Sequence, residues 1–273
     1  VIEAVKELYM HGIFGYYGNQ QSYNSAVEKW YLTRHNWKID EDSISVVHGI
    51  VAGIGMAIQA FSNPGDGVIV FTPVYHSFLS MIKKNGRKLL EYPLVIENKK
   101  YFIDFEQLEK RVKGNAKILL FCSPHNPGGR VWSKKELIKL ANFCEKKNLI
   151  LISDEIHNDL VYGQNKHMMF PVAAPHITNR LVVLVSSSKT FNIAGGLMGN
   201  VIIQDPNLRK KFKKIHQSIG TSPNLFGMKI AERAYAEGSQ WLDQLLIYLE
   251  GNNSVFDKGI SNIPGLHSMN LHA

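Results

Sequence analysis

Residues 181–196 read LVVLVSSSKTFNIAGG, and this stretch determines how we expect the rest of the chain to be arranged. The run LVVLV is apolar and mostly β-branched, a pattern that predicts a strand buried on both faces, as found in parallel sheets. Lys189 would then lie just past the carboxyl end of that strand, at the edge where ligands bind in open α/β sheets. An exposed, solvated lysine is the alternative, because lysine side chains are mostly exposed.

Two further buried strands end in polar residues that have specific uses. The run Lys117–Cys122 is followed by SPHNPGGR, whose prolines and glycines hold Asn126 in a rigid turn. The run Leu149–Ser153 is followed by DEIHND, which begins at Asp154. Helical patterns of ~10–15 residues between most strands predict a βαβ alternation, and so a mostly parallel α/β sheet flanked by helices. Because right-handed crossovers bring the carboxyl ends of parallel strands to one edge, we expect Asn126, Asp154 and Lys189 to converge there.

The remaining periodicity predicts most of the other elements. The expected helices are Val1–His11, Ser22–Arg34, Gly49–Phe61, Ser77–Asn85, Phe105–Lys113, Lys134–Lys147, and three more near 206–218, 223–236 and 239–259. The additional expected strands are Ser45–Val47, Val68–Phe71, Arg87–Pro93 and an antiparallel or edge strand at Gly199–Gln204. Asp104 is a candidate helix cap, and Ser133 with Glu136 has the spacing of a capping box.

Composition argues against several classes of protein. With 273 residues, 45% hydrophobic and 20% charged, the chain has the balance of a globular protein with an ample core. No apolar run approaches the roughly 18 residues of a membrane span and no signal peptide is evident, so we expect no membrane association and a cytoplasmic location. The net charge of +8 arises from lysines scattered among acidic residues, which argues against nucleic-acid binding. Cys122 and Cys144 are expected to be reduced core residues, with no disulfide framework and no metal site.

The three strand-end residues together suit a ligand that uses an amine, a carboxylate and an amide. Lys189 could form an imine with an aldehyde, a task that would offset the free-energy cost of an ammonium at the mouth of a buried strand. Asp154 could keep a heteroaromatic nitrogen protonated; alternatively, it caps a helix or pairs with Arg130. Pyridoxal phosphate presents an aldehyde, a pyridine nitrogen and a phosphate together.

The phosphate of such a cofactor has candidate ligands at two places. Ser186 and Ser188 offer hydroxyls just before Lys189, and the junction at Gly49 opens a helix whose free amides favour an anion. Taken alone, the Gly49 junction would not identify a phosphate site. Tyr75 closely follows another strand end and could stack on a ring.

Five motifs occur in the order NPGDGV, TPVYHSF, SPHNPGGR, SDEIHND and SSSKTFNIAGG. In that order they resemble the fold-type I pyridoxal-phosphate enzymes of the class I/II aminotransferase superfamily, and more narrowly its cystathionine β-lyase, or carbon–sulfur lyase, subgroup. The resemblance extends over nearly the whole chain, from FGY near the start to the segment Ala234–Trp241. It implies the large domain of a pyridoxal-phosphate transferase, with pyridoxal 5′-phosphate as cofactor.

The resemblance also implies a role for each candidate site residue. Lys189 binds the cofactor as an imine, Asp154 pairs with the pyridinium nitrogen, Asn126 bonds the phenolic oxygen and Tyr75 stacks on the ring. The implied phosphate ligands are Ser186, Ser188, the Ile50 and Val51 amides beside Gly49, and Tyr16 from a neighbouring subunit. Lys189, Asp154 and Tyr16 form the implied catalytic set.

Two positions separate the lyase subgroup from other members of the superfamily. His157, a candidate cofactor contact, stands where many aminotransferases have tyrosine, and it favours the lyase reaction; a structural histidine is the alternative. Leu197 stands eight residues after Lys189, where many aminotransferases carry a phosphate-binding arginine. Phosphate binding would therefore rest on hydroxyls, amides and Tyr16.

Both ends of the sequence fall within expected elements. A helical pattern is already under way at Val1 and a strand is expected to start shortly before Ala273, so we expect a fragment whose C-terminal small domain, with its carboxylate-binding arginine, is largely missing. The expected organisation is a segment at 1–20 from the small-domain or dimer-contact region, a large cofactor-binding domain at 21–240, and a long helix with the start of the small domain at 241–273.

The implied function is elimination of a thiol from an S-substituted cysteine, giving pyruvate and ammonia. A homodimer acting on a small amino-acid substrate is expected. An aminotransferase is the first alternative, because Lys189 and Asp154 begin both reactions. A fragment that binds the cofactor but is inactive or regulatory is the second.

Overall fold

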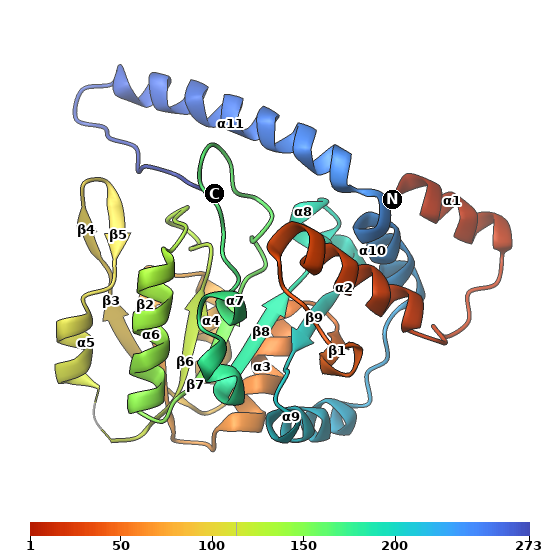
Figure 1. Ribbon diagram of the computed structural model, residues 1–273, viewed down its shortest axis with the longest axis horizontal. Coiled ribbons are helices and arrows are strands. Elements are labelled where there is room, and N and C mark those ends of the chain that lie inside the picture. The colour runs from red at the N-terminus through yellow and green to blue at the C-terminus, as the bar shows by residue number, and fades with distance from the viewer. Residues whose placement is uncertain (113) are drawn as a thin grey trace.

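The computed structural model describes residues 1–112 and 114–273. Its centre is a seven-stranded sheet with the strand order β1-β9-β8-β7-β6-β2-β3 (Figure 1). The strands of this sheet are β1 (Ile44–Val47), β2 (Gly67–Thr72), β3 (Lys88–Pro93), β6 (Ala116–Cys122), β7 (Ile150–Asp154), β8 (Leu181–Val185) and β9 (Gly199–Ile202). The strands β3, β2, β6, β7 and β8 are parallel, and β9 is antiparallel to both β8 and β1. The expected mostly parallel sheet is therefore confirmed, although β9 is an interior strand rather than an edge strand.

Helices cover both faces of the sheet, as Figure 1 shows. One face packs on α3 (Ile50–Phe61), α4 (His76–Lys84) and α9 (Pro206–Ile219). The other face packs on α2 (Gln21–His35), α5 (Phe105–Arg111), α6 (Lys134–Lys146) and α10 (Leu225–Glu237). Outside these layers, α1 (Ile2–His11) lies against α10, and α11 (Ser239–Ser261) runs above the edge at which β8 ends. The shorter elements are the hairpin β4 (Val95–Glu97) and β5 (Lys100–Phe102), the helices α7 (Phe170–Ala173) and α8 (Ser187–Thr190), and the 3-10 turns Glu41–Ser43, Pro175–Arg180 and Ala194–Gly196.

The strand β8 explains why an unbroken apolar run suits this sheet. Successive side chains of a strand point to opposite faces, so Val183 enters one hydrophobic core while Val182 and Leu184 enter the other. All residues of β8 are buried. Because burial of each such side chain contributes about 1.5–3 kcal/mol, a polar residue on either face would be costly.

The helix α3 begins at the same edge of the sheet at which β8 ends, because β1 runs in the same direction as β8. Its N-cap, Gly49, has a φ of +83°, in the left-handed region that favours glycine. Farther along, α3 packs so closely on the sheet that a Cβ at Gly53 would lie 2.9 Å from Val201 Cγ2. Small residues in this apolar helix therefore let it lie directly on β8 and β9.

The predicted caps are confirmed. Asp104 accepts a hydrogen bond of 3.0 Å from the Gln107 amide, and Ser133 and Glu136 form a reciprocal capping box. The helix α5 ends at Arg111, whereas the expected helix reached Lys113, which lies outside the described residues. Other boundaries differ from expectation by one or two residues, the range over which helix ends fray.

Two further expectations concern the cysteines and the membrane. Cys122 and Cys144 are free and buried, as predicted. Among the helices formed by residues 1–112 and 114–273, none is both long and apolar enough to cross a membrane. Ser239, the first residue of α11, lies next to the boundary expected at residue 240, but the division into domains stays a prediction.

Candidate active site

Asp154 is the last residue of β7, and Asn126 and Lys189 follow the neighbouring strands β6 and β8. All three line one cavity of about 310 Å³. The full lining consists of Ile50, Val51, Tyr75, Cys122, Asn126, Asp154, Ile156, His157, Ser188, Lys189, Ala194 and Leu197. The structure thus brings together most of the residues that the sequence singled out. The parallel order of the strands is the cause, because it places their carboxyl ends side by side.

Three of the expected site residues lie outside the cavity lining. Gly49 precedes Ile50 and caps α3. Ser186 is buried, and its hydroxyl donates to the Met198 carbonyl at 2.6 Å while accepting from the Ser188 amide at 3.0 Å. The Ser186 hydroxyl therefore fixes the backbone around Lys189 in this geometry. Tyr16 is 97% exposed on the segment between α1 and α2. The phosphate contacts expected of these residues stay predictions.

The carboxylate of Asp154 is buried with little hydrogen bonding. The residue is 4% exposed, and its Oδ1 accepts a hydrogen bond of 3.2 Å from the Ile156 amide. Burial raises the pKa of Asp154 to about 7, although the Ile156 amide and the charge of Lys189 act in the opposite direction. The pairing with Arg130 considered from the sequence does not occur, because Arg130 pairs with Glu136 at 2.7 Å.

Lys189 and His157 contribute an amine and an imidazole to the cavity. Lys189 is exposed to solvent at the cavity and comes from α8, a single turn of helix. Burial, assisted by the charge of Lys189, lowers the pKa of His157 to about 4. The imidazole is therefore neutral at pH 7, with one nitrogen able to donate and the other able to accept.

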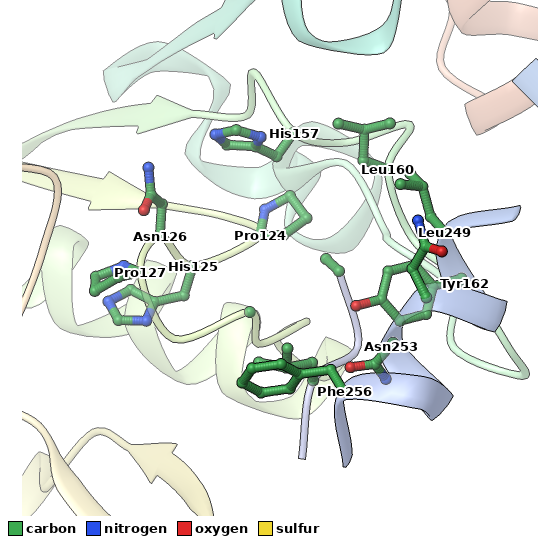
Figure 2. A pocket seen from close by; sticks show the side chains of 14 residues that line it. Pro124, His125, Asn126, Pro127, His157, Leu160, Tyr162, Leu249, Asn253 and Phe256 are labelled. Atoms are coloured by element: carbon green, nitrogen blue, oxygen red, sulfur yellow. The ribbon is translucent and has the colours of Figure 1, made fainter. Parts of the chain in front are cut away.

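A second cavity, of about 590 Å³, adjoins the first through Asn126 and His157. Figure 2 shows these two side chains on one side of it, while Leu249, Asn253 and Phe256 from α11 lie on the opposite side. Sequence reasoning missed this cavity because the helical pattern of α11 does not reveal which part of the sheet it covers. The cavity offers room beside the strand ends for a ligand larger than the first cavity holds.

The structure also adds Cys122, Ile156 and Ala194 to the site, and it confirms that Leu197, noted from the sequence for its spacing from Lys189, lies there. Cys122 was expected in the core, and it is buried, yet it also lines the cavity. Ile156, Ala194 and Leu197 complete the wall, and Leu197 adopts the left-handed conformation with a φ of +50°. These residues lie at a strand end, shortly after one, or shortly after Lys189, and that position in the sequence could have identified them.

A network of buried polar side chains was missed as well. Asp159 accepts hydrogen bonds from Trp30 Nε1 and Thr190 Oγ1, and it pairs with His35 Nε2 at 2.7 Å. The end of the motif SDEIHND was its signal, but partners this distant in the sequence cannot be read from a pattern. Within residues 1–112 and 114–273, no group of three or more His, Cys, Asp or Glu side chains is arranged to hold a metal ion.

Comparison with known proteins places this geometry in context. A family model described as aminotransferase class I and II matches residues 1–270. The chain is 41% identical over 254 residues to a cystathionine beta-lyase of Bacillus subtilis (strain 168), covering 92% of this chain and 66% of that relative.

Solved structures agree with the sequence match. Cystalysin from Treponema denticola, which contains a pyridoxal 5′-phosphate cofactor, superposes with a TM-score of 0.92 and 39% identity over 96% of this chain and 67% of its own. The pyridoxal-phosphate-bound C–S lyase from Staphylococcus hominis superposes with a TM-score of 0.90 and 31% identity over 96% of this chain and 66% of its own. The chain thus spans about two thirds of the length of the relatives it matches.

Proposed function

The chain belongs to the aminotransferase class I and II family, and from that premise we propose that the protein is a pyridoxal-phosphate-dependent carbon–sulfur β-lyase. The observation that carries the proposal is the meeting of Asn126, Asp154 and Lys189 in one cavity at the carboxyl edge of the sheet. These residues offer an amide, a carboxylate and an amine to a single ligand. The names of two relatives, cystathionine beta-lyase and C–S lyase, support elimination as the reaction.

The residues of the cavity fit the chemistry of pyridoxal phosphate. The Lys189 amine would bind the aldehyde carbon, and the buried Asp154 carboxylate, with acceptor capacity left over, would pair with the ring nitrogen. The Ile50 and Val51 amides at the start of α3 would bind the phosphate, because a helix N-terminus favours an anion.

Tyr75, Asn126 and Ser188 complete the fit. Tyr75 is half-buried at the cavity and would stack on the ring. Asn126 would bond the phenolic oxygen, and the Ser188 hydroxyl would add a bond to the phosphate. Phosphate binding would rest on these neutral groups because Leu197 occupies the position of the arginine that many aminotransferases use.

The bound cofactor supplies a protonated ring that accepts the electron pair left when the Cα–H bond of the substrate breaks. Once the substrate amine has displaced Lys189 from the aldehyde carbon, the freed lysine amine would take the Cα proton as the base. Asp154 holds the proton on the ring nitrogen, and a cationic ring beside it favours the ionised carboxylate despite burial. A thiolate on the substrate β-carbon would then leave, and water would hydrolyse the released aminoacrylate to pyruvate and ammonia.

Two observations favour elimination over amino transfer. His157 lies at the cavity as a neutral imidazole where many aminotransferases have tyrosine. In addition, the relative that is 41% identical carries the name cystathionine beta-lyase. An aminotransferase is the second candidate because the matching family model is described as aminotransferase class I and II, and a cofactor-binding protein without turnover is the third.

The test is to incubate the full-length protein with pyridoxal phosphate and cystathionine, and to measure pyruvate and thiol release. We expect both products in equal amounts, with Lys189→Ala as the control that loses them along with the absorbance of the lysine-bound cofactor. Amino transfer that depends on a keto acid, without thiol release, would favour the aminotransferase. Cofactor binding with neither reaction would favour the third candidate.

A homodimer is part of the proposal. Tyr16 is 97% exposed, and Ile13 and Phe14 beside it are 69% and 55% exposed. We propose that this segment meets a second copy of the chain and that Tyr16 reaches the phosphate of that copy. Sedimentation of the cofactor-loaded protein is expected to give a dimer; a monomer would contradict the role of Tyr16. The cytoplasmic location stays a prediction.

A further inference from the structure

We propose that the hydrogen bond between Asp159 and Thr190 is a positioning device that sets the place of Lys189 relative to Asp154. The proposal rests on the proposed function, in which Lys189 binds the aldehyde of the cofactor and Asp154 pairs with its ring nitrogen. Neither Asp159 nor Thr190 lines the cavity, so each would act through its neighbours. Both are therefore positioning residues.

Thr190 fixes the carboxyl end of the turn that carries Lys189. It is the last residue of α8 and is fully buried, and its Oγ1 donates to Asp159 Oδ2 at 2.8 Å. At the other end of the turn, Ser186 caps the Ser188 amide. Because the Lys189 side chain is exposed, the position of its amine depends on the backbone that these two contacts hold.

Two residues of α2 contact the Asp159 carboxylate. Its side chain is 1% exposed and pairs with His35 Nε2 at 2.7 Å. Trp30 Nε1 donates to both carboxylate oxygens, at 3.3 and 3.2 Å. A buried carboxylate whose donors are all in place is rigid, because loss of any donor leaves a desolvated acceptor.

The Asp159 carboxylate connects the segment after β7 with the turn after β8. Asp159 lies in the segment that follows β7, whose last residue is Asp154, whereas Thr190 lies in the turn that follows β8. Backbone hydrogen bonds from Asn158 to Glu155 and from Leu160 to His157 fold the first segment tightly. The Asp159–Thr190 bond therefore links the carboxylate end of the site to its amine end.

The experiment compares two cofactors that differ in their need for Lys189. Pyridoxal phosphate can bond covalently to the lysine, whereas pyridoxamine 5′-phosphate carries an amine in place of the aldehyde and cannot. Thr190→Val keeps the branched shape of the side chain and removes the donor. In the full-length protein we expect this change to raise the dissociation constant for pyridoxal phosphate about tenfold, by analogy with the loss of a residue that orients a metal ligand.

The same variant is expected to change the dissociation constant for pyridoxamine phosphate less than about twofold. Thr190→Ser restores the hydroxyl and is expected to return pyridoxal phosphate binding to near the wild-type value. Ser43→Ala is the matched control, because it removes another buried hydroxyl, which donates to the Asp40 carbonyl far from the cavity. Thermal unfolding of each cofactor-free protein is measured alongside.

Several results would overturn the proposal. If Thr190→Val weakens the binding of both cofactors equally, Thr190 has only a structural role. If the binding of both is unchanged, the bond from Thr190 to Asp159 is not needed. If the wild-type protein binds no pyridoxal phosphate, the proposed function fails together with this inference. If it binds the cofactor and Thr190→Val does as well, only the inference fails.

A second variant covers the case in which Thr190→Val does not fold. Trp30→Phe removes one donor from Asp159 and leaves its bonds to His35 and Thr190. We expect a smaller shift, about threefold, again for pyridoxal phosphate and not for pyridoxamine phosphate. An equal shift for both cofactors would contradict the positioning role here too.

Discussion

Asp154 and Asp159 lie five residues apart and are both buried, yet their surroundings differ. Three side chains from other parts of the chain contact the Asp159 carboxylate, by donation from Trp30 and Thr190 and by pairing with His35. Asp154 accepts from the Ile156 amide, and burial raises its pKa to about 7. A buried carboxylate that the protein itself satisfies is part of the architecture, whereas one left short of donors at a cavity points to a ligand that supplies the missing partner.

The largest effect is expected when the satisfied carboxylate is changed. Asp159→Asn removes the charge that pairs with His35 and turns an amide NH₂ toward groups that are themselves donors. We expect the free energy of unfolding of the cofactor-free protein to fall by about 3 kcal/mol, because buried donors are left without the acceptor that the carboxylate provided. Urea unfolding measures this, and a loss below about 0.5 kcal/mol would mean that the network adds little to stability.

Substitution of Asp154 is expected to raise the free energy of unfolding, by a smaller amount than the loss expected at Asp159. Its pKa is raised from 3.8 to about 7 in the folded protein, so its contribution to stability is fully present below about pH 4 and is lost as the pH rises through 7. Asp154→Asn stays neutral and avoids that loss. We expect the cofactor-free variant to be more stable than wild type by about 1–3 kcal/mol at pH 8 and nearly equal to it at pH 4. Denaturant unfolding at the two pH values measures the difference.

The same Asp154→Asn protein is expected to bind pyridoxal phosphate weakly. One substitution would then raise stability and weaken cofactor binding. Asp104→Asn is its control, because this variant keeps a capping side chain on α5, away from the cavity. If Asp154→Asn is no more stable than wild type at pH 8, the burial of its carboxylate costs little. The contrast with Asp159 would then lose its physical basis.

The sequence was sufficient to predict the sheet edge because its signals are local. Apolar runs mark β6, β7 and β8, and the handedness of βαβ units then brings Asn126, Asp154 and Lys189 together. The capping box at Ser133 could be read for the same reason, since both partners lie within one turn of helix.

Features that depend on distant partners could not be predicted in this way. The donors to Asp159 come from α2, and nothing local to Trp30 or His35 points to that carboxylate. The hydroxyl of Ser186 donates to the carbonyl of Met198, and the local pattern around Ser186 does not indicate that partner. The hairpin β4–β5 was missed because its strands are short and only partly buried, so their hydrophobic pattern is weak.

The reversed direction of β9 decides where this protein can tolerate changes in length. Because β9 starts at the edge where β8 ends, residues 186–198 never cross the sheet, and Ser188, Ala194 and Leu197 all form walls of one cavity. An insertion in this stretch would remodel the ligand site itself. The tight turn at Asn63–Gly67 lies at the opposite edge, where β2 begins, and an added loop or reporter there would leave the site untouched. Altered ligand preference is thus best sought between β8 and β9, and fusion partners are best attached at the opposite edge.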